Sequence, residues 1–272
     1  MTSLFSNSES FMITIEVVPP RGYRDRDLLN RLGTLSDLPF DRFNVATNPV
    51  ARAHMSASIF AARIQQSTGT PSIFHLTVRD QNQLSLQSEL WGARALGIDT
   101  VVVATGDPMP PRSKVPCWRV NELSVFELIS LARNSKFTTG AVLDFRPEQN
   151  GLAAEVKRLE KKVAAGCQFA ITQPVFDEDT ALTIQRATAH IPIPMVMGIL
   201  PLISHAHARF LHTKVDGIWV PQELQDDMET ALEPAQTGIQ NAKDMLALAR
   251  NHFSGACIMP PFERFDILNK IF

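Results

Sequence analysis

Short apolar runs alternate with longer amphipathic segments along the whole of this 272-residue chain. The short runs are rich in Val, Ile and Phe, and several are apolar throughout, which is typical of strands buried on both faces of a parallel sheet. In the segments between them, apolar side chains recur at helical spacing, as in Leu152, Val156, Leu159 and Val163. The runs predicted to be strands are 12–18, 42–46, 73–78, 100–104, 137–143, 169–172, 195–199 and 256–259.

Eight strands that alternate with helices predict a single (β/α)8 TIM barrel over residues 1–272. An open, doubly wound sheet is the alternative. The usual phosphate loops of that alternative are absent, because no G-x-G-x-x-G follows the first strand and no G-x-x-x-x-G-K-[ST] occurs in the chain. The long segment 204–254 is predicted to hold two helices, of which the second spans 234–250.

Composition and charge narrow the function. With 26 Lys+Arg against 28 Asp+Glu, the chain has no basic excess to neutralise nucleic-acid phosphates, although a local cluster could still bind a small anion. The three cysteines are widely spaced, so reduced thiols in a cytoplasmic protein are expected. No signal peptide is recognised, and the most apolar stretch, 191–203, is too short and too rich in proline to span a membrane.

Candidate chemistry is sought where the predicted strands end, because active sites of such barrels lie at that rim. Glu16 lies in the first apolar run, where loss of water raises a carboxyl pKa and suits a general acid; a structural partner for a buried Arg or Lys is the alternative. Alternation places His75, Thr77 and Arg79 on one side of the third strand. Asp107 follows the fourth strand and adds a second carboxylate.

Two further features complete this predicted rim. The glycine of the turn 105–107 allows close backbone approach, and Gln173 can present both a donor and an acceptor to the edge of a heterocycle. The set favours acid chemistry on a heterocycle over metal hydrolysis. His205, His207 and His212 fall on a predicted surface helix and are expected to be solvated, so no metal site is predicted.

Several runs of the sequence resemble the methylenetetrahydrofolate reductase family, in that family's order and over nearly the whole chain, with short bacterial members as the nearest type. The resemblance implies a (β/α)8 flavoprotein that reduces 5,10-methylenetetrahydrofolate to 5-methyltetrahydrofolate in one-carbon metabolism and methionine biosynthesis. NADH or NADPH would be the electron donor and FAD the bound cofactor, with no separate dinucleotide-binding domain. The runs are EVVPPR (16–21), HLTVRD (75–80), LQS (86–88), ALGI (95–98), TGDP (105–108), KVAAG (162–166), ITQPVFD (171–177) and GILP (198–201).

The resemblance also implies roles for single residues. Glu16 matches the family acid that helps to open the methylene bridge, and Asp107 matches the carboxylate between flavin and pterin. Gln173 matches a contact with both rings, and Gln222 and Met259 match positions on the folate side. Contacts with FAD are implied for Thr47, His75, Thr77, Thr105, Gly106, Asp107, Glu155, Arg158, Lys161 and Lys162, and Arg146 is a fork donor for a phosphate or a glutamate tail.

Departures from the family pattern leave alternatives open. The chain has one tyrosine, and Ala46, Val142 and Met259 stand where the family often carries a threonine and two tyrosines. The barrel could bind FAD, could pass hydride from NAD(P)H directly to the folate, or could be a folate-binding subunit that depends on a redox partner. A homo-oligomer is also compatible with the resemblance. By spacing alone, the charged side chains between 155 and 162 would form a solvated helix face. A carbonyl lyase would need a Schiff-base lysine at a strand end, and the sequence places none there.

Overall fold

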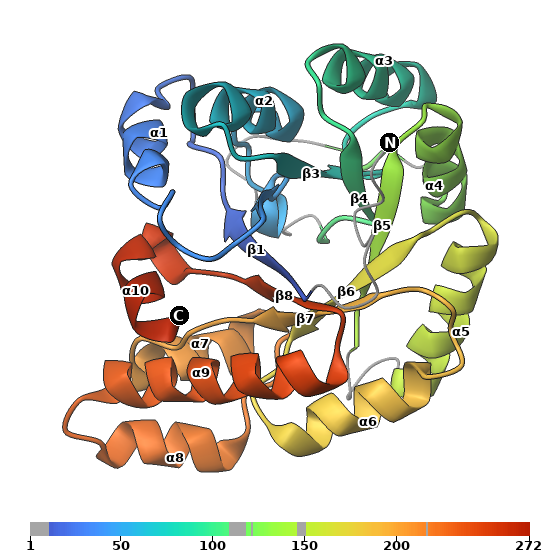
Figure 1. Ribbon diagram of the computed structural model, residues 1–272. Helices are drawn as coiled ribbons and strands as arrows, with labels where there is room; N and C mark the ends of the chain where they lie inside the picture. The colour runs from blue at the N-terminus through green and yellow to red at the C-terminus, as the bar shows by residue number, and fades with distance from the viewer. Residues whose placement is uncertain (1–10, 109–117, 121, 146–150, 216) are drawn as a thin grey trace.

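The computed structural model describes residues 11–108, 118–120, 122–145, 151–215 and 217–272. Eight parallel strands pair in chain order and β8 pairs with β1, so the sheet closes into a barrel that helices surround (Figure 1). This confirms the predicted (β/α)8 fold, and the ends of each predicted strand lie within two residues of those observed. The strands are β1 (Met12–Val17), β2 (Arg42–Val45), β3 (Ser72–Thr77), β4 (Thr100–Ala104), β5 (Thr138–Leu143), β6 (Phe169–Pro174), β7 (Met195–Ile199) and β8 (Gly255–Ile258).

Alternation along the strands separates the inside of the barrel from the core under the helices. Ile13 and Ile15 of β1 belong to the large outer cluster, whereas Met12 packs inside the barrel with Phe169 of β6. Gly140 of β5 faces that ring, and a Cβ atom there would overlap it. Side chains two or four positions further along the inward faces therefore point into the upper part of the barrel, and Glu16 is one of them.

Side-chain caps explain where several helices begin. Ser124 accepts from the Glu127 N–H and Glu127 accepts from the Ser124 N–H, which is a capping box at the start of α4. Asp177 caps α6 by accepting from the Thr180 N–H at 2.7 Å. No helix within the described ranges is long and apolar enough to cross a membrane. The helices are α1 (Arg26–Gly33), α2 (Ala57–Thr68), α3 (Gln83–Ala95), α4 (Val125–Asn134), α5 (Gly151–Ala164), α6 (Glu178–Thr188), α7 (His205–Lys214), α8 (Gln222–Thr230), α9 (Pro234–His252) and α10 (Leu268–Ile271).

Three helices, not the two predicted, connect β7 to β8. The predicted second helix is α9, but α8 was missed because its sequence, QELQDDMET, carries only two apolar side chains, Leu224 and Met228. In Figure 1, α8 lies beside α9 on one side of the barrel. A separate apolar cluster that includes Leu211, Val220 and Met228 joins α7 and α8. Three residues of the described chain, Lys214 at the end of α7 and Val215 and Ile218 after it, lie near the carboxyl ends of the strands.

Candidate functional site

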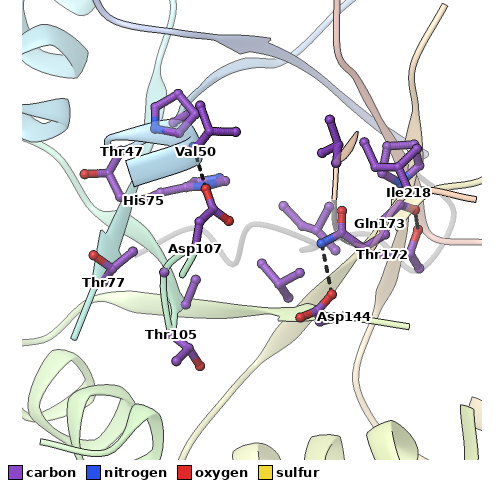
Figure 2. Close-up of a pocket in the computed structure, with 18 of the residues that line it drawn as sticks. Thr47, Val50, His75, Thr77, Thr105, Asp107, Asp144, Thr172, Gln173 and Ile218 are labelled. Carbon is purple, nitrogen blue, oxygen red and sulfur yellow. Dashed lines mark hydrogen bonds between the residues drawn. The ribbon is translucent and has the colours of Figure 1, made fainter. Parts of the chain in front are cut away.

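A cavity of about 840 Å³ opens at the carboxyl ends of the strands. Figure 2 shows His75, Thr47 and Asp107 on one side of it, with Gln173 and Asp144 on the opposite side. Most residues singled out from the sequence line this cavity, namely Glu16, Thr47, His75, Thr77, Thr105, Gly106, Asp107, Glu155, Arg158, Lys162, Gln173 and Met259.

Two of the predicted site residues do not line the described cavity, and a third cannot be placed against it. Lys161 is exposed on the outer face of α5. Gln222 is exposed on α8, where its amide donates to the Asp226 carboxylate at 2.7 Å. Arg146 lies outside the described residues. Helical spacing turns Lys161 and Gln222 away from the side of each helix that packs on neighbouring elements, so both face solvent.

Glu16 is the main candidate for proton chemistry. Its side chain is half-buried and lines the cavity at the end of β1. Burial, followed by the negative charge of Asp107, raises the pKa of Glu16 from 4.5 to about 7. The carboxyl group can therefore hold or release a proton near neutral pH, which is what a general acid requires.

Asp107 is held by a strained turn. Its Oδ2 atom accepts from the Val50 N–H at 2.6 Å, as Figure 2 shows. Val50 has a φ of +48°, a left-handed conformation that is costly for a β-branched residue, and Asn48 and Ala51 are left-handed as well. The turn after β2 thus points a backbone N–H at the carboxylate. Sequence reasoning did not assign Val50, because a left-handed valine has no sequence signature.

Arg79 ties the rim loops together from below. It is only 2% exposed, and its guanidinium donates to the backbone oxygen atoms of Asp107, at 3.1 Å, and Asn48, at 3.4 Å. It also pairs with Asp80 at 2.6 Å. Burial acts to raise the pKa of Asp80, but hydrogen bonds from Arg79 and Asn48 and the charge of Arg79 outweigh it and lower that pKa. Gly106 allows this packing, because its φ is +89° and a Cβ atom there would lie 3.0 Å from Arg79 Cβ.

A buried polar group lies beside Glu16 inside the barrel. Asn44 of β2 donates from Nδ2 to Cys257 Sγ at 3.2 Å, and its Oδ1 lies 2.9 Å from His75 Nε2. Burial lowers the pKa of His75 to about 4, so the imidazole is neutral. Burial and the nearby Glu16 raise the pKa of Cys257 to about 12, so it stays a thiol. Asn44 was not among the residues singled out from the sequence, but it shares the inward alternation of Ala46 and could have been found from it.

The charged residues of α5 are divided between the cavity and solvent. Glu155 and Lys162 are buried against the cavity, and Arg158 lines it and donates to Thr105 Oγ1 at 3.3 Å. Lys162 Nζ donates to the Val142 carbonyl at 2.5 Å, and burial lowers its pKa despite the nearby Glu155. A fully solvated helix face, which spacing alone favoured, is therefore wrong for these three residues. The cavity lining also includes two cationic side chains that were not predicted from the sequence, Arg119 and Lys214.

The opposite wall carries an amide. Gln173 Nε2 donates to Asp144 Oδ1 at 3.2 Å, as drawn in Figure 2, and this contact orients the amide at the cavity surface. Thr172 Oγ1 donates to the Gln173 carbonyl at 2.7 Å and accepts from the Gly198 N–H at 2.9 Å, so the ends of β6 and β7 are fixed to each other. The wall offers hydrogen-bonding groups on a rigid backbone.

The histidines of α7 form no metal site. Across the described ranges, no group of three His, Cys, Asp or Glu side chains could hold a metal ion. The expectation that His207 is solvated is wrong, since it is buried and burial lowers its pKa. Its ring packs on that of Phe262, with centroids 5.2 Å apart. His212 is half-buried, and its Nδ1 accepts from the Val220 N–H at 3.3 Å.

The fold and the cavity together define the chain as a (β/α)8-barrel protein with a polar cavity at the carboxyl ends of its strands. Active sites of this fold lie at that end of the barrel. Comparison with known sequences narrows the class further. The methylenetetrahydrofolate reductase family profile matches residues 2–251, and the chain belongs to this family.

Individual relatives are distant. The chain is 26% identical over 234 residues to the 5,10-methylenetetrahydrofolate reductase of Escherichia coli strain K12, covering 80% of this chain and 76% of that protein. It is 25% identical over 179 residues to a probable methylenetetrahydrofolate reductase (NADPH) of Caenorhabditis elegans. That match covers 64% of this chain and 27% of the nematode protein, so the chain spans only about a quarter of that relative.

Solved structures share the fold at low sequence identity. A Clostridium thermocellum protein described as binding two copies of 5-methyl-5,6,7,8-tetrahydrofolic acid superposes with a TM-score of 0.68 at 17% identity, covering 97% of this chain and 93% of that chain. An oxaloacetate acetylhydrolase superposes with a TM-score of 0.59 at 11% identity, covering 98% and 80% of the two chains. These likenesses establish the barrel architecture.

Proposed function

We propose that this protein reduces 5,10-methylenetetrahydrofolate to 5-methyltetrahydrofolate with NADH or NADPH as the electron donor. The observation that carries the proposal is the Glu16 carboxyl group, whose pKa burial and Asp107 raise to about 7 inside the cavity. Opening the bridged ring of this substrate needs a proton on a ring nitrogen, and an acid with a pKa near the working pH supplies one efficiently. Membership of the reductase family and the folate bound by a barrel of the same fold support the choice of substrate.

Each rim residue has a defined part in this proposal. Glu16 donates its proton to the leaving nitrogen of the methylene bridge, and the C–N bond to that nitrogen breaks to leave a cationic iminium on the folate. Asp107 stabilises that positive charge as an anion, and the Val50 N–H holds its carboxylate in place. A hydride then adds to the iminium carbon and forms the methyl group. Gln173 binds the pterin edge through its amide, and Met259 packs on the folate side.

The cavity also fits FAD by its chemistry. Arg158 and Lys162 are cations that would hold its phosphates, and the hydroxyl groups of Thr77 and Thr105 would bind its ribityl oxygen atoms. His75, Thr47, Gly106 and Glu155 complete that wall of the cavity. When bound there, FAD supplies two-electron transfer between NAD(P)H and the folate.

A second candidate keeps the reaction but dispenses with FAD. Val142 and Met259 place apolar side chains on the cavity wall where the family often presents tyrosines, and Ala46 replaces a threonine. Fewer polar contacts for a flavin favour direct hydride transfer from NAD(P)H to the folate. A third candidate is a folate-binding subunit that turns over only with a redox partner.

The absorption spectrum of the purified protein and a turnover assay decide among these candidates. The assay follows NADH or NADPH oxidation with 5,10-methylenetetrahydrofolate and identifies 5-methyltetrahydrofolate by mass spectrometry. A flavin band with turnover supports the FAD enzyme, and colourless protein that is active without added FAD supports direct transfer. Folate binding without turnover by either donor supports the subunit. Absence of both folate binding and turnover contradicts the proposal.

A further inference from the structure

A chain of hydrogen bonds crosses the barrel interior just below the cavity. It runs from Cys257 on β8 through Asn44 on β2 to His75 on β3, with contacts of 3.2 Å and 2.9 Å. Asn44 and Cys257 are completely buried, so neither side chain can exchange its partner for water. The proposed reaction assigns no proton transfer to Asn44 or Cys257, and their buried hydrogen bonds therefore need another explanation.

The direction of the hydrogen bond from Asn44 to Cys257 fixes where the His75 proton lies. The Asn44 amide donates from Nδ2 to the Cys257 sulfur, which turns its Oδ1 toward His75 Nε2. An amide oxygen can only accept, so Nε2 must carry a hydrogen atom. Burial keeps the imidazole neutral, and a neutral imidazole has one N–H only. Nδ1 is then left with a free lone pair.

That lone pair is available to a ligand. His75 lines the cavity, and its Nδ1 makes no hydrogen bond within the described residues. Among the described residues, four side-chain polar atoms are fully buried without a hydrogen-bond partner, and Nδ1 of His75 is not one of them. Nδ1 is therefore accessible from the cavity. A half-buried acceptor at this position would pair with an N–H or O–H group of the molecule that fills the cavity.

We propose that Asn44, oriented by Cys257, is a positioning residue that holds His75 in its Nε2–H tautomer and so presents Nδ1 as a hydrogen-bond acceptor to the ligand. The ligand group is a donor, such as a ring N–H or ribityl hydroxyl of the flavin, the carboxamide of the nicotinamide or the N–H edge of the pterin. The identity of that ligand rests on the proposed function, whereas the tautomer does not. The same ring with Nδ1 protonated would repel such donors and select acceptors instead.

The tautomer is measured directly by NMR of protein labelled with ¹⁵N in its histidines, without substrate. The His75→Gln variant identifies the His75 signals by their loss. We expect Nε2 at the frequency of a protonated ring nitrogen and Nδ1 at that of an unprotonated one from pH 6 to 8. The reverse pattern, or a doubly protonated ring, overturns the proposal. Because no turnover is needed, this result is independent of whether the protein proves to be a reductase.

Matched variants test the two supporting residues. Asn44→Asp keeps an acceptor facing His75 and should keep the proton on Nε2, whereas Asn44→Leu removes it and should give both tautomers. Cys257→Ala frees the amide to turn and should also give both tautomers, and it serves if Asn44→Leu does not fold. If Cys257→Ala shows a single Nε2–H tautomer, the role assigned to Cys257 is wrong. If Asn44→Leu shows a single Nε2–H tautomer, the role assigned to Asn44 is wrong.

Kinetics identify which ligand uses the acceptor. If Asn44→Leu populates both tautomers about equally, only about half of the protein presents Nδ1 as an acceptor, so one KM should rise about twofold, with a smaller change in kcat. A rise in the KM of NAD(P)H assigns the donor group to the nicotinamide, and a rise in the KM of the folate assigns it to the pterin. A weaker affinity for FAD assigns it to the flavin. Unchanged KM values for both, together with an unchanged affinity for FAD, in a variant whose tautomer has changed, would overturn the role of Nδ1 in binding.

Discussion

Replacing Glu16 by Gln should stabilise the protein, and by an amount that depends on pH. In the folded protein, the pKa of Glu16 is raised from its ordinary 4.5 to about 7. The favourable contribution of Glu16 to the free energy of unfolding is therefore fully present below pH 4.5. It is lost as the pH rises through about 7, because the carboxyl group is then charged in the folded protein. At 1.36 kcal/mol per pKa unit, the difference corresponds to about 3 kcal/mol.

The neutral amide of Gln avoids this cost at every pH. We expect the free energy of unfolding of Glu16→Gln to exceed that of wild type by about 2 kcal/mol near pH 6 and by about 3 kcal/mol near pH 8. Near pH 4 the two proteins should be equally stable. Urea denaturation of both proteins at each pH measures it. Glu233→Gln is the control, because Glu233 is exposed and its side chain makes no hydrogen bond within the described residues. A gap between Glu16→Gln and wild type that stays constant with pH would refute the reasoning.

Three further outcomes follow from the same geometry. Asp107→Asn removes a negative charge beside Glu16 and so lowers the pKa of Glu16 in the folded protein. The pH at which stability stops falling, about 7 in wild type, should therefore move down and the total loss should shrink, as urea titrations across pH would record; an unmoved profile would show that the two carboxyls do not interact. Val50→Gly relieves a left-handed valine that is 49% exposed, and should change the unfolding free energy by between zero and a gain of about 1 kcal/mol; a loss above about 1 kcal/mol would mean that the turn is not strained. Gly140→Ala places a methyl group against the Phe169 ring inside the barrel and should lower the free energy of unfolding by about 2 kcal/mol. Gly33→Ala is the control, because a Cβ atom there meets nothing within 4 Å and should leave stability unchanged. Equal shifts of the thermal unfolding temperature in the two variants would contradict this packing.

The barrel could be predicted from the sequence because buried parallel strands leave a strong local signal. Eight apolar runs coincide with the eight strands, and the residues that follow them, such as Glu16 and Asp107, do meet around one cavity. Helices with few apolar residues were harder to predict. The α8 helix was missed because two apolar side chains give too little periodicity, and it is stabilised by a tertiary cluster that includes Met228.

The rest of the site depends on distances that no local pattern encodes. Glu155 and Lys162 look like members of a solvated helix, yet the curvature of the barrel turns them toward the Val142 carbonyl and the cavity. The hydrogen bond from Asn44 to Cys257 spans 213 positions of the chain, and the turn at Val50 reaches a carboxylate 57 positions away. Long-range pairs of this kind emerge only when the sheet closes.

The central claim is that Glu16 supplies the proton for folate reduction, and the rate of 5-methyltetrahydrofolate formation tests it most directly. Wild-type kcat/KM for the folate should fall as the pH rises through about 7, where Glu16 loses its proton. Glu16→Gln should bind the folate as wild type does, yet form product at least about 100-fold more slowly at every pH. Product formation by Glu16→Gln at the wild-type rate, with the same fall above neutral pH, would contradict the account.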